Sequence, residues 1–323
     1  MGKCLVTKLD GSTNNSDLLR IGEMRIKISK VSNPTATTQC FVISFLKDTK
    51  LEIIGDGYFT DSSLSQNKGK NLTITAGIST EVYVSNNDIE VAVLDRYAIT
   101  SLMVKSGYNG NISFNIDCLK YSTSINTIYL GSTQVSGDIA ALKNLTALTT
   151  IYLGSTQVSG DIAALKNLTA LTTIYLSSTQ VSGDIAALKN LTALTTISMS
   201  STQVSGDIAA LKNLTALTIM EFKNVTGLRG DMGTLPDNIL FFTGGKGNFT
   251  WTTSSRTYIL ATEGAHCDRI DDMLNDMATK TAKFAGDEAW YKTISLIGTR
   301  TSASDAAVQT LQSKGYTVSI TPA

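Results

Sequence analysis

The residues with the most reactive side chains lie close together in the C-terminal part of the sequence. The single histidine, His266, directly precedes Cys267. A thiol and an imidazole form a nucleophilic pair only when the fold turns both toward one point, and side chains adjacent on a turn usually point apart. There is no second histidine for a zinc site of common type. The neighbouring carboxylates Asp268, Asp271 and Asp272 lack the spacing of an EF-hand calcium loop.

A glycine-rich stretch is the second candidate for chemistry. Residues 243–248, with the sequence TGGKGN, place a lysine among glycines, as phosphate-binding loops do. Such a loop needs the pattern GxxxxGK[ST] and a following helix, and neither is present. The patterns GxSxG and HExxH and the dinucleotide-binding fingerprint are also absent. We therefore expect no catalytic residue, no metal and no cofactor, and a protein that is not an enzyme. The alternative left open is an active site built from carboxylates on distant loops.

The chain is dominated instead by a repeat with a period of 23 residues. The phrase STQVSGDIAALKNLTALTTIYLG is written almost four times, starting at Ser132, Ser155, Ser178 and Ser201. A period of this size indicates a solenoid, in which each copy covers the apolar residues of the next. Within one copy, Ile151 and Leu153 alternate with polar residues, which predicts a short strand with one buried face.

Each copy also contains the residues expected at a tight turn. Asp161 precedes the segment IAALKNL, where it can cap a short helix or 3₁₀ turn. Gly160, just before it, is suited to a positive φ or to a crowded position. Thr156 can supply a hydrogen bond within the turn. The ladder of Lys166 and its equivalents is interpreted, like the aspartate ladder, as solvated structure.

The outward positions of the strands are the candidate binding residues. They are Thr127, Tyr129, Thr150, Tyr152, Thr173, Tyr175, Thr196 and Ser198. Tyrosine offers flat contact area at low entropic cost, and the hydroxyls of threonine and serine offer adaptable hydrogen bonds. The competing interpretation is that threonine and tyrosine are simply good strand formers.

Composition excludes several classes of function. The 323 residues have a net charge of zero and only 17% charged residues, so a nucleic-acid-binding protein is not expected. The four cysteines lie far apart without a CxxC pair, which predicts free thiols in a reducing cytoplasm. The opening MGKCLVTKLDGS is too polar for a signal peptide, and no apolar run is long enough to span a membrane.

We divide the chain into four parts. Residues 1–47 predict a small β module, suited to attachment, with strands near 5–7, 24–28 and 40–46. Residues 48–131 predict irregular repeats and an N-terminal cap, and residues 132–245 the regular array. Residues 246–323 predict a βαβαβ cap, with strands near 258–261, 293–298 and 316–320. Its helices are expected at 268–280 and from a cap at Ser304–Asp305 to Gly315.

The repeat unit resembles the leucine-rich repeat. It has the form LxxIxLxxTxVxGDIAxLxxL, which resembles in particular the plant-type variant, whose consensus carries Asn at Thr156 and Ile-Pro at Ile162–Ala163. The resemblance implies an α/β solenoid. A parallel sheet would line its concave face, short helical or 3₁₀ turns would form its convex face, and the small β module would precede it.

The two ends of the chain carry a further resemblance. The stretches CLVTKLDGS, RIGEMRIKI and GTRTSASDAAVQTLQSKGYTV resemble leucine-rich-repeat proteins of tailed phages of gut bacteria. This implies a virion appendage, a fibre, spike or decoration protein, made in the bacterial host cytoplasm. Its N-terminal module would bind other virion proteins, its repeat face would bind a host-surface glycan or protein, and a homo-oligomer is suggested. The alternative is an intracellular bacterial scaffold for protein–protein interaction.

Overall fold

The structure is a computed structural model that describes most of the chain. Backbone and side chains are described for residues 99–104, 112–252, 254–282 and 292–323. Of the residues before 99, the backbone of eight strands is described. The predicted strand near 5–7 lies outside the described residues. The chain divides into two compact units, Met1–Val158 and Ser159–Ala323, which we describe one at a time.

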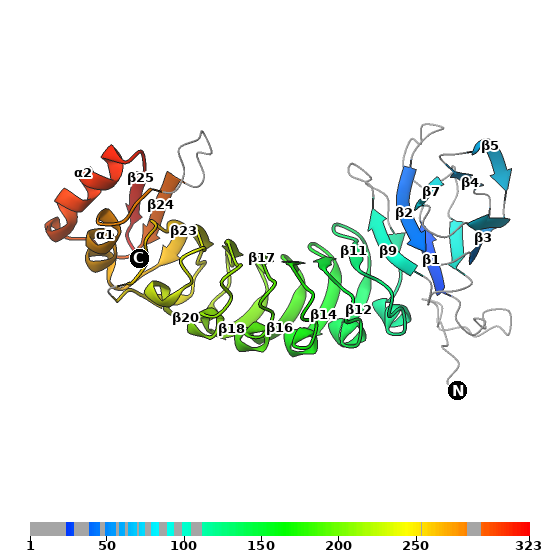
Figure 1. Ribbon diagram of the computed structural model, residues 1–323, viewed down its shortest axis with the longest axis horizontal. Helices are drawn as coiled ribbons and strands as arrows, with labels where there is room; N and C mark the ends of the chain where they lie inside the picture. The colour runs from blue at the N-terminus through cyan, green and yellow to red at the C-terminus, as the bar shows by residue number, and fades with distance from the viewer. Residues whose placement is uncertain are drawn as a thin grey trace. The chain divides into compact units, whose positions relative to one another are not determined.

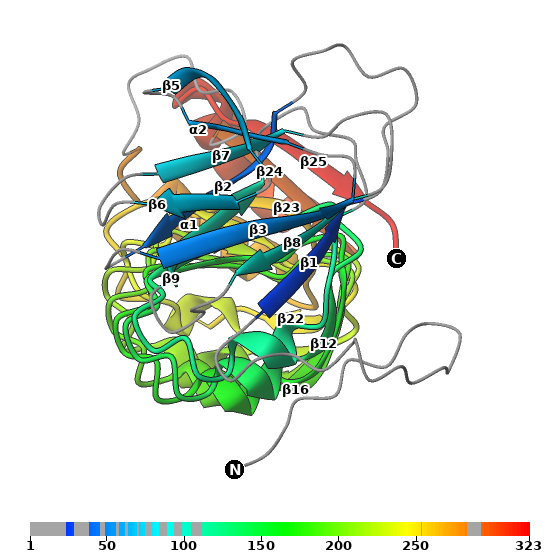
Figure 2. The same cartoon turned by 90° about the vertical axis from the view of Figure 1, so that its right-hand side faces the viewer.

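The first unit begins with antiparallel strands. These are β1 (Met24–Ile28), β2 (Gln39–Phe45), β3 (Thr49–Gly55), β4 (Tyr58–Asp61), β5 (Leu64–Gly69), β6 (Asn71–Ile74), β7 (Ser79–Tyr83) and β8 (Ile89–Val93). One sheet has the order β10-β1-β8-β3-β6, where β10 is Ile112–Ser113, and Figure 2 looks onto it. In a second sheet β2 lies between β7 and β9 (Ile99–Val104), and β4 pairs with β7 and β5.

The pairing of these strands corrects one expectation. Alternating residues between 51 and 93 suggested the first, irregular rungs of the solenoid. The structure pairs β3 with β6 and β8, and β1 with β8, in antiparallel fashion instead. A period of two predicts a strand but not its partner, and short connections favour antiparallel neighbours. Parallel stacking begins at β9, which pairs with β11 (Thr127–Tyr129). The predicted boundaries of the four parts stay predictions.

The first repeats of the solenoid complete this unit. Strand β13 (Thr150–Tyr152) continues the parallel pairing, so that Ile128 lies between Leu102 and Ile151 in register. All three side chains are fully buried. The opposite wall holds the 3₁₀ turns η3 (Ile116–Leu119) and η4 (Ile139–Leu142) and the short strand β12 (Ser136–Asp138). The apolar residues of the repeat therefore form ladders between two walls, as a solenoid requires.

The second unit holds the remaining repeats and two parallel sheets. One sheet contains β15 (Thr173–Tyr175), β17 (Thr196–Ser198), β19 (Ile219–Glu221), β21 (Phe241–Thr243) and β23 (Ala261–His266). The other contains β14 (Gln157–Asp161), β16 (Gln180–Asp184), β18 (Gln203–Asp207), β20 (Gly227–Asp231) and β22 (Asn248–Thr250). Figure 1 shows β17 on one side and β16, β18 and β20 on the other. We did not predict the second sheet, because the segment QVSGD has only one apolar residue.

The tight turns between the sheets confirm the expected residue roles. They are η5 (Ile162–Leu165), η6 (Ile185–Leu188), η7 (Ile208–Leu211) and η8 (Met232–Thr234). At η6, the Asp184 carboxylate accepts a hydrogen bond of 2.8 Å from the Ala186 amide. Gly183 has a φ of +112°. Thr179 donates its hydroxyl to the Leu176 carbonyl at 2.6 Å and closes the preceding turn.

The C-terminal segment forms the predicted strand–helix–strand–helix–strand series. Helix α1 (Ile270–Ala278) follows β23, then β24 (Thr293–Ile297), η10 (Ser302–Ser304), α2 (Asp305–Ser313) and β25 (Thr317–Thr321). The three strands pair in parallel, and Figure 1 shows both helices on one side of β24 and β25. None of the described helices is long and apolar enough to span a membrane.

Two local predictions in this segment need correction. The strand expected at 258–261 begins only at Ala261, because Tyr258 forms an isolated bridge to Thr281 instead. Ser304 is the N-cap residue of α2, as predicted, but its side chain makes no cap hydrogen bond, since its hydroxyl donates to the Asp271 carboxylate at 2.5 Å. Gly315 has the positive φ expected just beyond the end of a helix.

Candidate functional site

The predicted binding residues of the first unit lie side by side on two strands. The parallel register places Thr127 opposite Thr150 and Tyr129 opposite Tyr152, while Ile128 points into the core. The Tyr129 and Tyr152 rings are stacked, with centroids 4.2 Å apart and planes 18° from parallel. Tyr129 remains 40% exposed. The sequence predicted the two tyrosines but not their stacking.

Strand β9 adds two residues to this face of the sheet that sequence reasoning missed. Register pairs Ser101 with Thr127 and Met103 with Tyr129. Met103 is half-buried, whereas Ser101 is only 9% exposed and its hydroxyl is buried. We call the set the tyrosine face, and its residues are Ser101, Met103, Thr127, Tyr129, Thr150 and Tyr152. None of the six carries a charge. Thr127 also donates its hydroxyl to the Asn126 side chain at 2.9 Å. This hydrogen bond orients the Thr127 side chain and does not involve the tyrosine rings.

The second unit presents a different surface at the same strand positions. Thr173 lies opposite Thr196, and Tyr175 opposite Ser198. Ser198, predicted to be outward and available, is only 3% exposed. Its hydroxyl lies 2.8 Å from the Ser177 hydroxyl and donates to the Glu221 carboxylate at 2.7 Å. Ser198 is therefore held within a row of polar side chains.

Beyond this row the strands form a charged hollow of about 290 Å³, whose residues the sequence analysis missed. They are Ser200, Glu221, Lys223, Phe241, Thr243 and Glu263. Lys223 lies 3.7 Å from Glu263, with both side chains more than half exposed, so the pair contributes little to stability. Extending the 23-residue period from Tyr175 through Ser198 reaches Glu221, which is the signal that could have found this hollow.

The candidate reactive pair is not arranged for catalysis. His266 is the last residue of β23 and is half-buried. Cys267 is buried, and burial raises the pKa of its thiol to about 11, so the thiol is protonated at neutral pH. A reactive cysteine needs the opposite shift. Among the residues that the structure describes, no group of three or more His, Cys, Asp or Glu side chains is placed to hold a metal ion.

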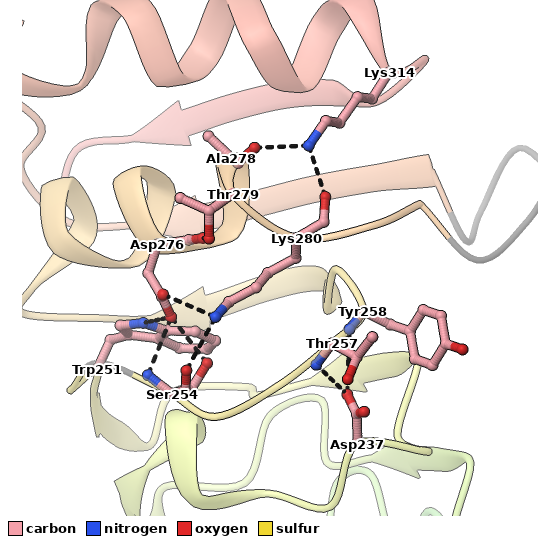
Figure 3. Close-up of polar contacts among 10 residues, drawn as sticks. All are labelled: Asp237, Trp251, Ser254, Thr257, Tyr258, Asp276, Ala278, Thr279, Lys280 and Lys314. Atoms are coloured by element: carbon pink, nitrogen blue, oxygen red, sulfur yellow. Dashed lines mark hydrogen bonds and ion pairs between the residues drawn. The ribbon is translucent and has the colours of Figure 1, made fainter.

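A polar cluster joins helix α1 to the loop before β23 (Figure 3). The Asp276 carboxylate accepts hydrogen bonds from Trp251 Nε1 at 3.1 Å and from the Ser254 hydroxyl at 2.8 Å. Lys280 Nζ lies 3.1 Å from the same carboxylate. Burial alone would raise the pKa of Asp276, but the hydrogen bonds from Ser254 and the Lys280 charge lower it. Lys314 Nζ donates at 2.6 Å to the carbonyls of Ala278 and Lys280.

A buried arginine closes the turn next to this cluster. The Arg256 guanidinium donates to the carbonyls of Leu235, Pro236, Asp237 and Ile239. Burial lowers the pKa of Arg256 to about 10, and the nearby Asp237 charge opposes this shift. Asp237 itself accepts amide hydrogen bonds from Thr257 and Tyr258, which lower its pKa against the effect of burial. Because the charged side chains are held by hydrogen bonds to neighbouring loops, we assign the cluster a structural role.

Comparison with known proteins finds similar solved structures at low sequence identity. No family model and no curated protein matches the chain. Among solved structures, it is similar to the leucine-rich-repeat ectodomain of the receptor kinase SOBIR1 from Arabidopsis thaliana, at 19% identity and a TM-score of 0.36. That match covers 41% of this chain and 74% of the other. An internalin (inlF) from Listeria monocytogenes matches at 17% identity and a TM-score of 0.37, covering 72% and 85%.

A third similar structure is the Arabidopsis receptor kinase HAESA in complex with the peptide hormone IDA and the co-receptor SERK1. It matches at 17% identity with a TM-score of 0.42, and the match covers 58% of this chain but only 32% of the receptor. The parallel strands, the 3₁₀ turns and the 23-residue period together make the array a leucine-rich-repeat solenoid.

Proposed function

We propose that this chain is a binding protein that holds a protein partner against the tyrosine face of its first unit. The observation that carries the proposal is the stacked pair of Tyr129 and Tyr152 on an uncharged sheet surface. The centres of protein–protein interfaces are enriched in tyrosine and methionine and depleted of charged residues. With Met103 beside Tyr129, the tyrosine face has this composition.

The rigidity of the face supports the same conclusion. The strands beneath it are held by parallel pairing in register, and their core residues are fully buried. The stacking limits the movement of both rings before any partner arrives. A preorganised surface loses less conformational entropy on binding, so more of the contact energy appears as affinity. Flat tyrosine rings on a rigid sheet therefore suit a contact of long lifetime.

For the biological setting we propose the particle of a tailed phage, with the partner on the host surface. What supports this setting is the resemblance of the two chain ends to phage leucine-rich-repeat proteins, together with the neutral character of the tyrosine face. Within this proposal, the N-terminal strands attach the chain to other virion proteins. The competing setting is the bacterial cytoplasm, with the solenoid as a scaffold for another cellular protein.

The binding face is tested by site-specific photocrosslinking. Benzoylphenylalanine is placed at Tyr129 in the full chain, and at the exposed lysine of η4's end, Lys143, as a control on the opposite wall. We expect irradiation in the producing cells, or with host cells added, to join a protein to position 129 and not to position 143. Equal products from both positions, or none from 129, would refute the tyrosine face. A carbohydrate joined to position 129 would replace the protein partner by a glycan.

The setting is tested separately by mass spectrometry of purified phage particles from the genome that encodes this chain. We expect its peptides at levels comparable with known structural proteins of the particle. Peptides found only in the lysed-cell fraction would reject the virion setting and favour the scaffold. That result leaves the crosslinking test of the tyrosine face intact.

A further inference from the structure

The structure assigns to Gly131 the role of a positioning residue that determines where the tyrosine face carries an aromatic platform. Gly131 lies just before the first copy of the repeat, two residues beyond Tyr129, the last residue of β11. The inference deepens the proposed function and rests on it in one respect, the claim that the stacked rings contact the partner. The placement of the Tyr152 ring by Gly131 can be tested without any ligand.

The geometry at Gly131 leaves no space for a side chain. A Cβ atom there would lie 2.6 Å from Tyr152 Cδ1 and closer still to Cε1, distances that real Cβ atoms do not show. Gly131 is not among the glycines with a positive φ. Its backbone could therefore accept alanine, and the reason for glycine is the ring of Tyr152. Because Gly131 has no side chain, the Tyr152 ring can lie against it while it stacks on Tyr129.

The second unit shows what happens when this space is filled. Ser177 lies two repeat periods after Gly131, at the equivalent position, and the residue that reaches it from the next repeat is Ser198 instead of a tyrosine. The two hydroxyls lie 2.8 Å apart. Ser177 also accepts a hydrogen bond of 2.9 Å from the Ser200 amide. A small polar pair thus replaces the glycine and ring.

The same combination of residue types recurs along the sequence at a spacing of 21 residues. Gly131 stands 21 residues before Tyr152, Gly154 stands 21 before Tyr175, and Ser177 stands 21 before Ser198. In these copies glycine stands 21 positions before each tyrosine, and serine stands 21 positions before Ser198. At Gly131 the missing side chain leaves room for a half-buried ring, whereas Ser177 bonds a buried hydroxyl. A repeat with glycine at this position therefore offers an aromatic surface on which flat, uncharged side chains of a polypeptide can bind. A repeat with serine there offers no such surface.

The placement of the Tyr152 ring by Gly131 is tested by nitration of tyrosines with tetranitromethane. Trypsin cleaves the array after Lys120, Lys143, Lys166 and Lys189, and the resulting peptides that contain Tyr129, Tyr152 and Tyr175 all differ in sequence. The peptide with Tyr129 also contains Tyr121, so fragment ions locate the nitro group within it, and mass spectrometry then follows each ring separately. We expect Gly131→Ala to accelerate nitration of Tyr152 and Tyr129 severalfold, because the ring must leave its place. Ser177→Ala, at the matched position, should leave both rates unchanged.

Binding is tested with a defined probe. A fluorescent dodecapeptide is selected from a random display library against the wild-type full chain, and it is retained if Tyr129→Ala weakens its binding. Gly131→Ala should then weaken it by at least about tenfold, or about 1.4 kcal/mol, and Ser177→Ala should not. Altered nitration with unchanged affinity would refute the claim that the stacked rings contact the partner. Unchanged nitration would refute the claim that Gly131 places the Tyr152 ring. If no peptide depends on Tyr129, the proposed function fails, and the nitration rates still test the role of Gly131.

A transplant provides the reverse test. Ser198→Tyr alone places a ring against the Ser177 side chain, and we expect it to lower the melting temperature of the chain. Adding Ser177→Gly should recover about 2–4 °C of that loss, because the ring gains its space and can stack on Tyr175. Equal melting temperatures of the single and double variants would contradict the claim that the residue 21 positions earlier makes room for the ring.

Discussion

The glycine and aspartate ladders on the turn side of the solenoid are predicted to stabilise the fold as coupled pairs. In the second unit, a Cβ on Gly183 would lie 2.9 Å from Asp161 Cγ and would overlap its Oδ1. The same Oδ1 caps η5 by accepting from the Ala163 amide at 2.8 Å. Replacing Gly183 with alanine should therefore disturb its own backbone and also displace the cap of the preceding rung.

The magnitudes follow from these two effects. Asp161→Ala removes one cap and should cost about 1 kcal/mol of unfolding free energy. Gly183→Ala forces a side chain onto a φ of +112°, which costs about 2 kcal/mol, and displaces the cap for about 1 kcal/mol more. In the double variant the cap is already gone, so the total should be about 3 kcal/mol instead of the summed 4 kcal/mol. The expected coupling is thus about 1 kcal/mol.

The assay is urea unfolding of the four proteins of this cycle, followed by far-ultraviolet circular dichroism, with equal denaturant slopes as the condition for comparison. The matched control pairs Gly183→Ala with Asp207→Ala. The Asp207 carboxylate caps η7 and abuts Gly230 instead of Gly183. These two changes should add. A coupling of less than about 0.3 kcal/mol between Asp161 and Gly183 would refute the shared-space argument.

Three further predictions concern single side chains. Because the pKa of Asp276 is lowered in the fold, its stabilising contribution is present above the unfolded value and lost as the pH falls through the folded value. Asp276→Asn should therefore reduce the fall in unfolding free energy between about pH 5 and pH 3 in urea titrations, and an unchanged pH profile would contradict this. Ser122 is fully buried, and its hydroxyl has no hydrogen-bond partner among the residues that the structure describes, so Ser122→Ala should raise the unfolding free energy by about 1 kcal/mol; a loss would show that the hydroxyl is satisfied. Arg256→Met strands four carbonyls and should cost about 3 kcal/mol, visible in the fluorescence of Trp251, and a cost below about 1 kcal/mol would reject its role.

The structure of the repeat was predictable because every copy carries the same residue types at the positions that form its turns. Asp184 caps, Gly183 takes a positive φ and Thr179 closes the turn, as their residue types indicate. The N-terminal strands were predictable as strands but not in their pairing, because alternation says which face is buried and not which strand lies alongside. The side chain of Ser304 does not cap α2 as predicted, because it forms a hydrogen bond with Asp271, 33 residues away, instead.

The candidate site was predictable in part for the same reason. The outward residues of the strands follow from alternation, and Tyr129, Tyr152 and their neighbours lie on the face where they were expected. Their stacking, and the burial of Ser198, depend on what the adjoining rung offers at Gly131 or Ser177. The charged hollow also lies outside the regular copies, where the period continues but the residue types change.

By itself the sequence determined the period, the buried ladders, the turn residues and the neutral character of the tyrosine face. These are properties of one residue and its nearest neighbours along the chain, and they recur wherever the phrase recurs. Only the tertiary structure decided the second sheet, the antiparallel start of the chain, and which tyrosine stacks on which. Those outcomes depend on contacts between rungs, where a side chain meets residues 21 to 23 positions away. Local sequence patterns do not show how much space one repeat leaves for a side chain of the next. Here that space decides whether the next repeat places a tyrosine ring or a serine hydroxyl at this position.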